Sequence, residues 1–279
     1  MSLIIPSIER TCAEVLHCPH CQGSFQIADG VVVCMNGHDF PLASAGYLNL
    51  LQQPVSDICN EKSLTANRTV AEQGFFAVLE AALVKTILSI TNHKSELVIL
   101  DAGCGEGSLL SGVLLSLRWE GINVKAIGID NTREAIRHAA NLEQEVGWIV
   151  ADIAQLPVQN DSVDIILNTI CPANYSEFNR VLKPGGWLIK TIPNRGHLSE
   201  LRPMSIHEDP GNENLQSTFE AHMNLSFSKR ISETRCVDVT DKMLLFDMSL
   251  VDTQPADYEI SAAIDRCSID FTLLVGQKY

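Results

Sequence analysis

The stretch that most constrains the fold is ELVILDAGCGEGSLL, residues 96–110. Its apolar run LVIL predicts a buried strand that leads directly into a turn containing Gly103, Gly105 and Gly107, after which a helical pattern begins. Glycines in such a turn permit tight backbone geometry and the close approach of a ligand. Asp101 stands at the end of the strand. The stretch therefore predicts a strand, a ligand-binding turn and a helix.

Further strand patterns follow at a regular period. VKAIGID ends in Asp130 and precedes the helical TREAIRHAANL, and WIVADI carries Asp152 and Ile153. SVDIILN and KPGGWLIKTIP predict a fourth and a fifth strand. This alternation favours a doubly wound parallel sheet with ligands at the carboxyl ends of the strands. There, Asp130 is placed to accept both hydroxyls of a ribose, and Asp152 to contact an adenine amino group.

A second motif lies near the N-terminus, in HCPHCQGSFQIADGVVVCMNGHDF, residues 17–40. Cys18 and Cys21 form a C-x2-C pair, and Cys34 and His38 form a C-x3-H pair. Two such pairs around a short β-hairpin suit a tetrahedral zinc ion, which a closed set of four ligands makes structural. His17 and His20 flank the first pair as competing ligands. The alternative is four unrelated buried residues.

Length and charge narrow the function. A chain of 279 residues is long enough for two domains, and it shows neither a signal peptide nor an apolar membrane span, so we expect a cytoplasmic protein. The net charge of −14 repels nucleic acid, so RNA binding would need a local basic patch. Basic residues gather in the second half: Arg180, Lys183, Lys190, Arg195, Arg202, Lys229, Arg230 and Arg235.

The motifs DAGCGEG, GID, ADIAQLP and LKPGGWL resemble those of class I S-adenosylmethionine-dependent methyltransferases over residues 95–195. With the zinc motif ahead of them, and with HDFPLASAGYLNLL and PNRGHLSELR, nearly the whole chain resembles the bacterial 23S rRNA (guanine-N1)-methyltransferases of the RlmA type. The resemblance implies a Rossmann-like α/β fold, with a doubly wound, mostly parallel seven-stranded sheet behind a small zinc-ribbon-like domain. The expected domains are a zinc module at 1–53, a helical connector at 54–93 and a methyltransferase domain at 94–279.

The resemblance also implies site residues. Gly105 and Glu106 of the glycine turn, and His197 after the fifth strand, would contact S-adenosylmethionine. Phe76 takes the place of a family tyrosine, keeping its stacking face without the hydroxyl. The family commonly ends in an antiparallel pair. Here IDFTLLVGQKY is the expected last strand, and its partner is either MSLVD or a segment near YEISAA.

Guanine N1 must lose a proton on methylation, and the base must leave its pair to be reached. The residues expected in the wall of the base pocket are Asn168, Pro172 and Asn174, with His197 beside them. Asparagine can hydrogen-bond a guanine edge but cannot take its proton, and helix capping is an equal alternative for these side chains. The pattern therefore identifies no general base.

The leading hypothesis is a methyltransferase that uses S-adenosylmethionine and a structural Zn2+ to modify guanine N1 in 23S ribosomal RNA. The expected partner is an RNA hairpin, with no membrane, and a homodimer is left open. A methyltransferase for a small molecule is the alternative that the acidic charge favours. A non-catalytic protein that binds S-adenosylmethionine and zinc is the third hypothesis.

Overall fold

The computed structural model describes residues 14–28, 31–51, 61–201, 212–248 and 264–279. Its N-terminal part is a small antiparallel sheet in the order β1-β2-β3. The strands are β1 (Phe25–Ala28), β2 (Val31–Cys34) and β3 (Asp39–Pro41). Two of them are the hairpin strands expected between the two metal-ligand pairs.

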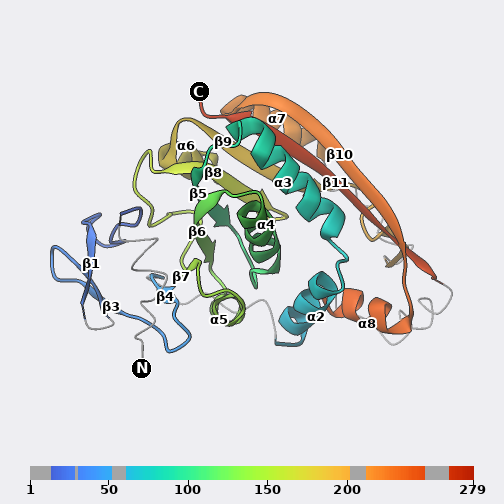
Figure 1. The fold of residues 1–279 in the computed structure, drawn as a ribbon, viewed down its shortest axis with the longest axis horizontal. Coiled ribbons are helices and arrows are strands. Elements are labelled where there is room, and N and C mark those ends of the chain that lie inside the picture. Colours follow the sequence, from blue (N-terminus) through green and yellow to red (C-terminus); the bar gives the residue numbers. More distant parts are fainter. Residues whose placement is uncertain (1–13, 29–30, 52–60, 202–211, 249–263) are drawn as a thin grey trace.

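A second sheet of eight strands organises the rest of the chain, in the order β10-β11-β9-β8-β5-β6-β7-β4 (Figure 1). The strands from β9 to β4 run parallel to their neighbours, and β11 pairs antiparallel with both β9 and β10. The bounds are β4 (Leu48–Asn49), β5 (Glu96–Ala102), β6 (Asn123–Asp130), β7 (Gly147–Val150), β8 (Val163–Thr169), β9 (Leu182–Pro193), β10 (Asn224–Cys236) and β11 (Arg266–Gln277).

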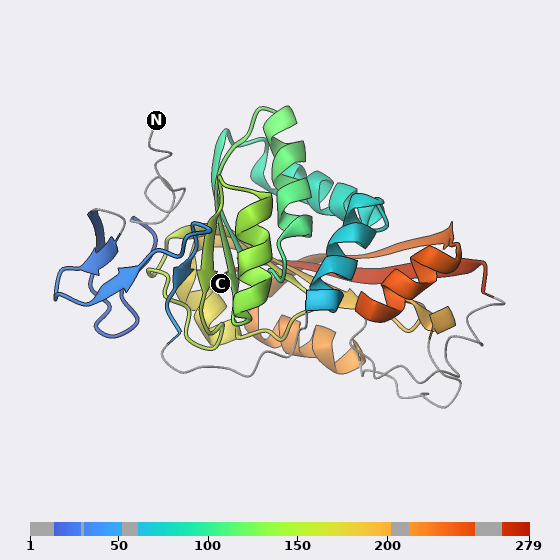
Figure 2. The same cartoon turned by 90° about the horizontal axis from the view of Figure 1, so that it is seen from below.

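Helices cover both faces of this sheet (Figure 2). One apolar cluster joins the sheet to α3, α4 and α5, and a second joins it to α6 and α7. The helices are α2 (Glu61–Glu72), α3 (Ala77–Thr91), α4 (Ser108–Trp119), α5 (Arg133–Leu142), α6 (Tyr175–Val181), α7 (Asn212–His222) and α8 (Val239–Met248), with the 3-10 turn η1 (Ser199–Leu201). This layering confirms the predicted fold class.

The sheet has one strand more than expected, because the chain leaving the zinc motif adds β4 beside β7. The backbone N–H of Leu50 extends this contact by donating to Val150 O at 2.8 Å. The zinc motif is also held from its other side. There Leu16 and Val158 form an antiparallel bridge, and the N–H of Gln159 donates to Val15 O at 2.7 Å.

The expected partner of the last strand was wrong. β11 pairs with β10, whereas Met248 ends α8 and residues 249–263 lie outside the described part of the chain. β10 is an edge strand whose side chains are mostly exposed. Leu225, Phe227 and Ile231 alternate with polar residues, but Lys229 interrupts the series and only Ile231 is buried, so the pattern of a half-buried strand is weak.

The helical connector consists of two helices. α2 and α3 meet at a bend of 71°, and Gly74 between them adopts a left-handed conformation with a φ of 71°. Among the described residues no single helix is long and apolar enough to cross a membrane, and this bent pair passes that test by length and composition only. Leu79, Leu83 and Ile87 of α3 are buried against the large sheet.

Candidate active site and metal centre

The side chains of Cys18, Cys21, Cys34 and His38 converge at one end of the small sheet. One ligand atom from each lies within 4.8 Å of the others. His38 Nδ1 is 3.3 Å from Cys34 Sγ and 3.6 Å from Cys18 Sγ, and Cys21 Sγ is 3.6 Å from Cys34 Sγ. A zinc ion with bonds of about 2.0–2.3 Å separates its tetrahedral ligands by about 3.5–3.8 Å, so the four residues fit zinc.

The competing histidines point elsewhere. The ring of His20 stacks on Phe40 with a centroid distance of 5.7 Å, and His17 Nδ1 lies 3.2 Å from the carbonyl oxygen of Cys18. Neither histidine joins the cluster. The four ligands close the coordination sphere, so a metal held here would be structural and not catalytic.

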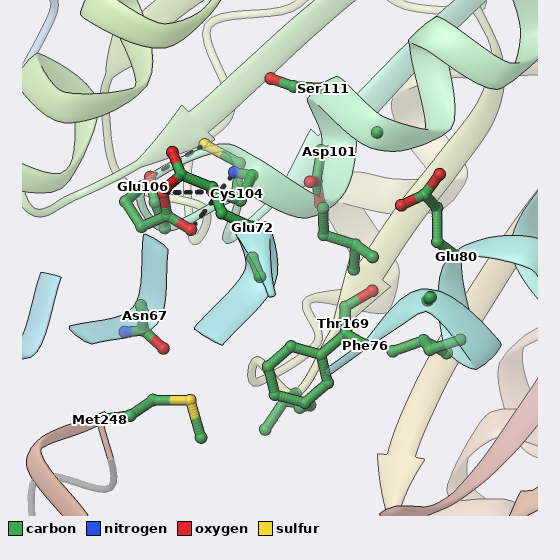
Figure 3. Close-up of a pocket in the computed structure, with 18 of the residues that line it drawn as sticks. Asn67, Glu72, Phe76, Glu80, Asp101, Cys104, Glu106, Ser111, Thr169 and Met248 are labelled. Atoms are coloured by element: carbon green, nitrogen blue, oxygen red, sulfur yellow. Dashed lines mark hydrogen bonds between the residues drawn. The ribbon is translucent and has the colours of Figure 1, made fainter. Parts of the chain in front are cut away.

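A cavity of about 970 Å³ opens at the carboxyl end of β5, between the glycine turn, α2 and α3 (Figure 3). Most of its wall is apolar, with Phe76, Leu115 and Phe246 among the large side chains. Four carboxylates also line it, from Glu72, Glu80, Asp101 and Glu106. Among the described lining residues there is no lysine or arginine, so the cavity suits a ligand that carries positive charge.

The three glycines of the turn have different roles. Gly105 has a φ of 56°, and a side chain there would meet no protein atom within 4 Å. By contrast, a Cβ on Gly103 would lie 2.2 Å from Cys171 Sγ, and one on Gly107 would lie 2.6 Å from the Trp148 ring. Gly105 therefore leaves ligand space on the cavity wall, whereas Gly103 and Gly107 permit close packing of the protein on itself.

Two carboxylates flank the glycine turn. Asp101 is 3% exposed, lines the cavity, and its Oδ1 has no hydrogen-bond partner among the described residues. Asp130 accepts the N–H of Gly105 at 3.0 Å and the N–H of Thr132 at 2.8 Å, one on each oxygen. Each oxygen of Asp130 keeps a second lone pair for a ligand hydroxyl. Asp101 instead offers a buried acceptor suited to a cationic donor such as an ammonium group.

The residues implied by resemblance also gather at the cavity. Glu106, His197 and Phe76 all line it. Glu106 accepts the Ser108 hydroxyl at 2.7 Å, and burial raises the pKa of this carboxyl above its ordinary value. The ring centroids of His197 and Phe76 are 6.5 Å apart.

The other predicted residues do not line this cavity. Asn168 is fully buried, and its side-chain N–H groups donate to backbone carbonyl oxygens. Asn174 caps α6 by accepting the N–H of Glu177 at 3.2 Å. Asp152 accepts the N–H of Ala154 at 2.8 Å. Ile153 and Pro172 line a separate hollow of about 450 Å³, together with Asn174.

Sequence reasoning missed part of the wall. Thr169 and Ile170 line the cavity directly after the buried Asn168, because successive residues at the end of a strand point to opposite sides. β8 is buried on both faces, so only its two-residue period, which puts Thr169 on the side opposite to Asn168, could have indicated Thr169. Asn67 of α2 and Met248 of α8 also line the cavity. They lie so far apart in the sequence that no local pattern could have joined them.

Two family models match the chain. The model described as "RlmA, N-terminal", a zinc ribbon, matches residues 16–57, and the model described as "Methyltransferase domain" matches residues 93–249. YxjB of Bacillus subtilis (strain 168), named for 23S rRNA (guanine-N(1)-)-methyltransferase activity, is 31% identical over 95% of this chain and 98% of its own. The chain belongs to the 23S rRNA (guanine-N1)-methyltransferase family.

Two further proteins are similar. The 23S rRNA (guanine(748)-N(1))-methyltransferase of Streptomyces fradiae is 30% identical over 70% of this chain and 69% of its own. Among solved structures, the YcgJ protein of Bacillus subtilis has a TM-score of 0.46 at 19% identity, over 68% of this chain and 96% of that one.

The cavity of this methyltransferase fits S-adenosylmethionine. That molecule carries positive charges on its sulfonium and on its ammonium group. The wall supplies four carboxylates, and among its described residues there is no lysine or arginine. Asp101 offers an unused acceptor, and Gly105 leaves room beside the backbone. S-adenosylmethionine and zinc are therefore the cofactors of this chain.

Asp101→Asn should stabilise the ligand-free enzyme while weakening its affinity for S-adenosylmethionine. Burial, with a smaller effect from the charge of Asp130, raises the pKa of Asp101 from 3.8 to about 7. The folded chain therefore holds a proton that the unfolded chain has released, and this group makes the fold less stable as pH rises from about 4 to 7. The gain in the free energy of unfolding should be about 2–4 kcal/mol at pH 8.

The gain should shrink toward zero as the pH falls to about 3, below the ordinary pKa of the carboxyl, where the group is mostly neutral in both states. Urea unfolding at the two pH values measures it, and calorimetry at pH 8 measures cofactor affinity, which should fall by about tenfold or more. An equal gain at both pH values would show that Asp101 is not held protonated in the ligand-free fold.

Proposed function

We propose that this enzyme transfers the methyl group of S-adenosylmethionine to N1 of a guanine in 23S ribosomal RNA. The observation that carries the proposal is the acidic cavity at the glycine turn, in a chain whose relatives at about 30% identity are named for this reaction. The proposed contacts are Asp130 for the ribose, Asp152 and Ile153 for the adenine, and the cavity residues for the methionine part. The cavity residues are Phe76, Asp101, Gly103, Gly105, Glu106 and His197, and Gly107 is kept in the proposed set as the last glycine of the turn, at the N-cap of α4.

The bound cofactor supplies an electrophilic methyl group, so the protein has mainly to align the acceptor and to exclude water. The apolar wall, with Phe76, Phe246 and Ile170, serves the exclusion of water. Guanine N1 lies on the Watson–Crick edge, so the base has to leave its pair to enter the cavity. Its flat apolar faces can then pack against these side chains.

The N1 proton has to leave the guanine before or during transfer. The groups of the cavity wall that can accept it are the carboxylates and the ring of His197, and among the carboxylates Glu106 is mostly buried and has a raised pKa. A carboxyl with a raised pKa is a stronger base, closer to what this transfer requires. Asn168 and Asn174 cannot serve, because neither amide accepts a proton near neutral pH.

The test is transfer of labelled methyl groups to 23S RNA that lacks its native guanine methylation. The RNA is digested to nucleosides, which are identified by mass and retention. We expect 1-methylguanosine as the labelled nucleoside. Label at another guanine position would contradict the assignment of N1, and unlabelled RNA in the presence of bound cofactor would contradict the assignment of the substrate.

The finer expectations belong to this proposal. We keep the division into a zinc module at 1–53, a connector at 54–93 and a methyltransferase domain at 94–279. β4 joins the first of these to the large sheet, so the module and the sheet are tied by backbone contacts. An RNA hairpin as the recognised element and a cytoplasmic location follow from the substrate. A homodimer stays a prediction, which the mass of the protein in solution checks.

A small-molecule acceptor is the second candidate, and the pairing of the basic side chains favours it. Several of these side chains form ion pairs: Lys183 and Lys94 with Asp164, Arg180 with Glu177, and Arg230 with Asp270. Arg202 of the expected basic group lies outside the described residues. The further ion-paired cations are Lys62, Arg68, Arg118, Lys125, Arg137 and Lys278.

RNA binding by this enzyme should therefore depend weakly on salt. Each phosphate neutralised by a cation contributes about −0.7 to −0.9 to the slope of log affinity against log salt concentration. With so many cations already paired, we expect a slope no steeper than about −3. Filter binding of 23S RNA between 50 and 300 mM salt, roughly the useful range, measures it. A slope near about −6 would show that the paired cations exchange their carboxylate partners for RNA phosphates and form a basic surface on binding.

A further inference from the structure

The last residue of β8 and the loop after it, together residues 169–174, form one wall of the cavity. Thr169 and Ile170 line it, and the Thr169 hydroxyl oxygen is buried with no hydrogen-bond partner in the described part of the chain. Ile170 has a φ of 51° and is 52% exposed. A positive φ is strained for a β-branched residue, so other contacts have to hold the loop in this shape.

A buried ammonium group lies beneath the loop. Lys190 of β9 is 4% exposed, and its Nζ donates to Cys171 O at 2.9 Å and to Asn168 Oδ1 at 2.7 Å. The amide of Asn168 carries the connection further, because its Nδ2 donates to Ala102 O at 2.8 Å and to Pro172 O at 3.3 Å. These bonds tie the carboxyl ends of β5 and β8 to β9 and to the loop.

The charge of Lys190 is costly to bury. Burial lowers the pKa of this ammonium, and both oxygens that it contacts are neutral. No ion pair joins it to a carboxylate within the described residues. A methionine of similar length would fill the space without that cost. Unlike a methionine, the ammonium group donates hydrogen bonds to the carbonyl oxygen of Cys171 and to Asn168 Oδ1.

The loop is also packed against the glycine turn. Cys171 Sγ occupies the space beside Gly103 where a Cβ would lie. A shift of the loop would therefore move the thiol away from the turn and move Thr169 and Ile170 on the wall. The hydrogen bonds of Lys190 and Asn168 thus fix the position of the wall residues against which an acceptor base would lie.

We propose that Lys190 is a positioning residue, which holds residues 169–174 in their strained shape and thereby places Thr169 and Ile170 against the acceptor. The placement of an acceptor rests on the proposed function. That Lys190 keeps the loop in its shape does not depend on the proposed function, and the accessibility of Cys171 measures it separately.

The experiment compares Lys190→Met with Lys183→Met, a lysine near the other end of β9 that forms a surface ion pair with Asp164. Iodoacetamide is added to the full chain without cofactor or RNA, and peptide masses give the alkylation rate of Cys171. The exposed Cys236 serves as internal reference. Lys190→Met should raise the Cys171 rate by about tenfold or more, since the loop opens locally, and Lys183→Met should leave it unchanged.

Two further results separate positioning from general damage. Lys190→Met should lower kcat for RNA methylation by about tenfold or more, since a small misplacement of a reacting group is costly, with cofactor affinity and the KM for RNA nearly unchanged. Adding Ile170→Gly should return the Cys171 rate toward that of the wild type, because glycine adopts the positive φ without strain. A merely destabilised fold would show neither the split between kcat and affinity nor the rescue.

A Cys171 rate in Lys190→Met equal to that of the wild type would overturn the proposal. If Lys190→Met does not fold, Lys190→Gln, whose amide can donate one of the two hydrogen bonds, decides on the same alkylation readout with an intermediate rate expected. If the wild type does not methylate RNA, the proposed function fails, and the alkylation rates still decide whether Lys190 holds the loop.

Discussion

Replacing Gly105 with asparagine should weaken the binding of S-adenosylmethionine by about 100-fold or more, close to 3 kcal/mol, while the fold stays intact. The side chain of residue 105 would enter cavity space that meets no protein atom, so it would occupy the room that the cofactor needs. Asparagine tolerates a positive φ better than other residues with a side chain, so the backbone can keep its value of 56°.

Gly121 provides the matched control. It too has a positive φ, of 79°, and a side chain there would meet no protein atom, but it lies beyond α4 and away from the cavity. Gly121→Asn should bind the cofactor like the wild type, as measured by calorimetry, with similar thermal unfolding of both variants. Unchanged affinity in Gly105→Asn would show that the cofactor lies elsewhere.

Replacing Cys34 with serine should remove zinc and unfold the small sheet. Cys34 Sγ lies within 3.6 Å of two other ligand atoms, and serine offers zinc no thiolate. A module of three short strands depends on its metal, whose binding contributes about 10–16 kcal/mol in zinc-finger peptides. Zinc content by mass spectrometry should fall to a small fraction of the wild-type value, and methylation of RNA should be lost with it.

Cofactor affinity should change by less than about threefold in Cys34→Ser, because no zinc ligand lines the cavity. Cys236→Ser, which alters an exposed thiol on β10, should keep its zinc and its activity. If cofactor binding disappears together with zinc, the division between the module and the methyltransferase domain is wrong, and the contacts through β4 would explain the coupling.

The sequence predicted the elements whose signal is local. The strand and glycine turn at 96–110 form one continuous pattern, and the metal ligands lie in pairs with a characteristic spacing, so both were placed from residues alone. The roles of Gly103 and Gly107 were less accessible. Their packing partners, Cys171 and Trp148, lie tens of residues away, and only the fold brings them together.

The acceptor side was hard to predict for two physical reasons. Asn168 and Thr169 are adjacent, and a shift of one residue at the end of a strand exchanges the buried side chain for the one on the cavity wall. The wall is also completed by α2 and α8, which come from distant parts of the chain. Lys190 was counted among the basic residues that could form a patch for RNA, yet it is buried and donates to Cys171 O of the loop.

The most direct measurement is reverse transcription of 23S RNA after incubation with the enzyme and S-adenosylmethionine. A methyl group on guanine N1 blocks base pairing, so the account predicts a stop at a single guanine with the wild type and with Gly121→Asn. The same stop should be absent with Gly105→Asn. Full-length transcripts from RNA treated with a wild-type enzyme that binds its cofactor would contradict the account and assign the cavity to a different acceptor.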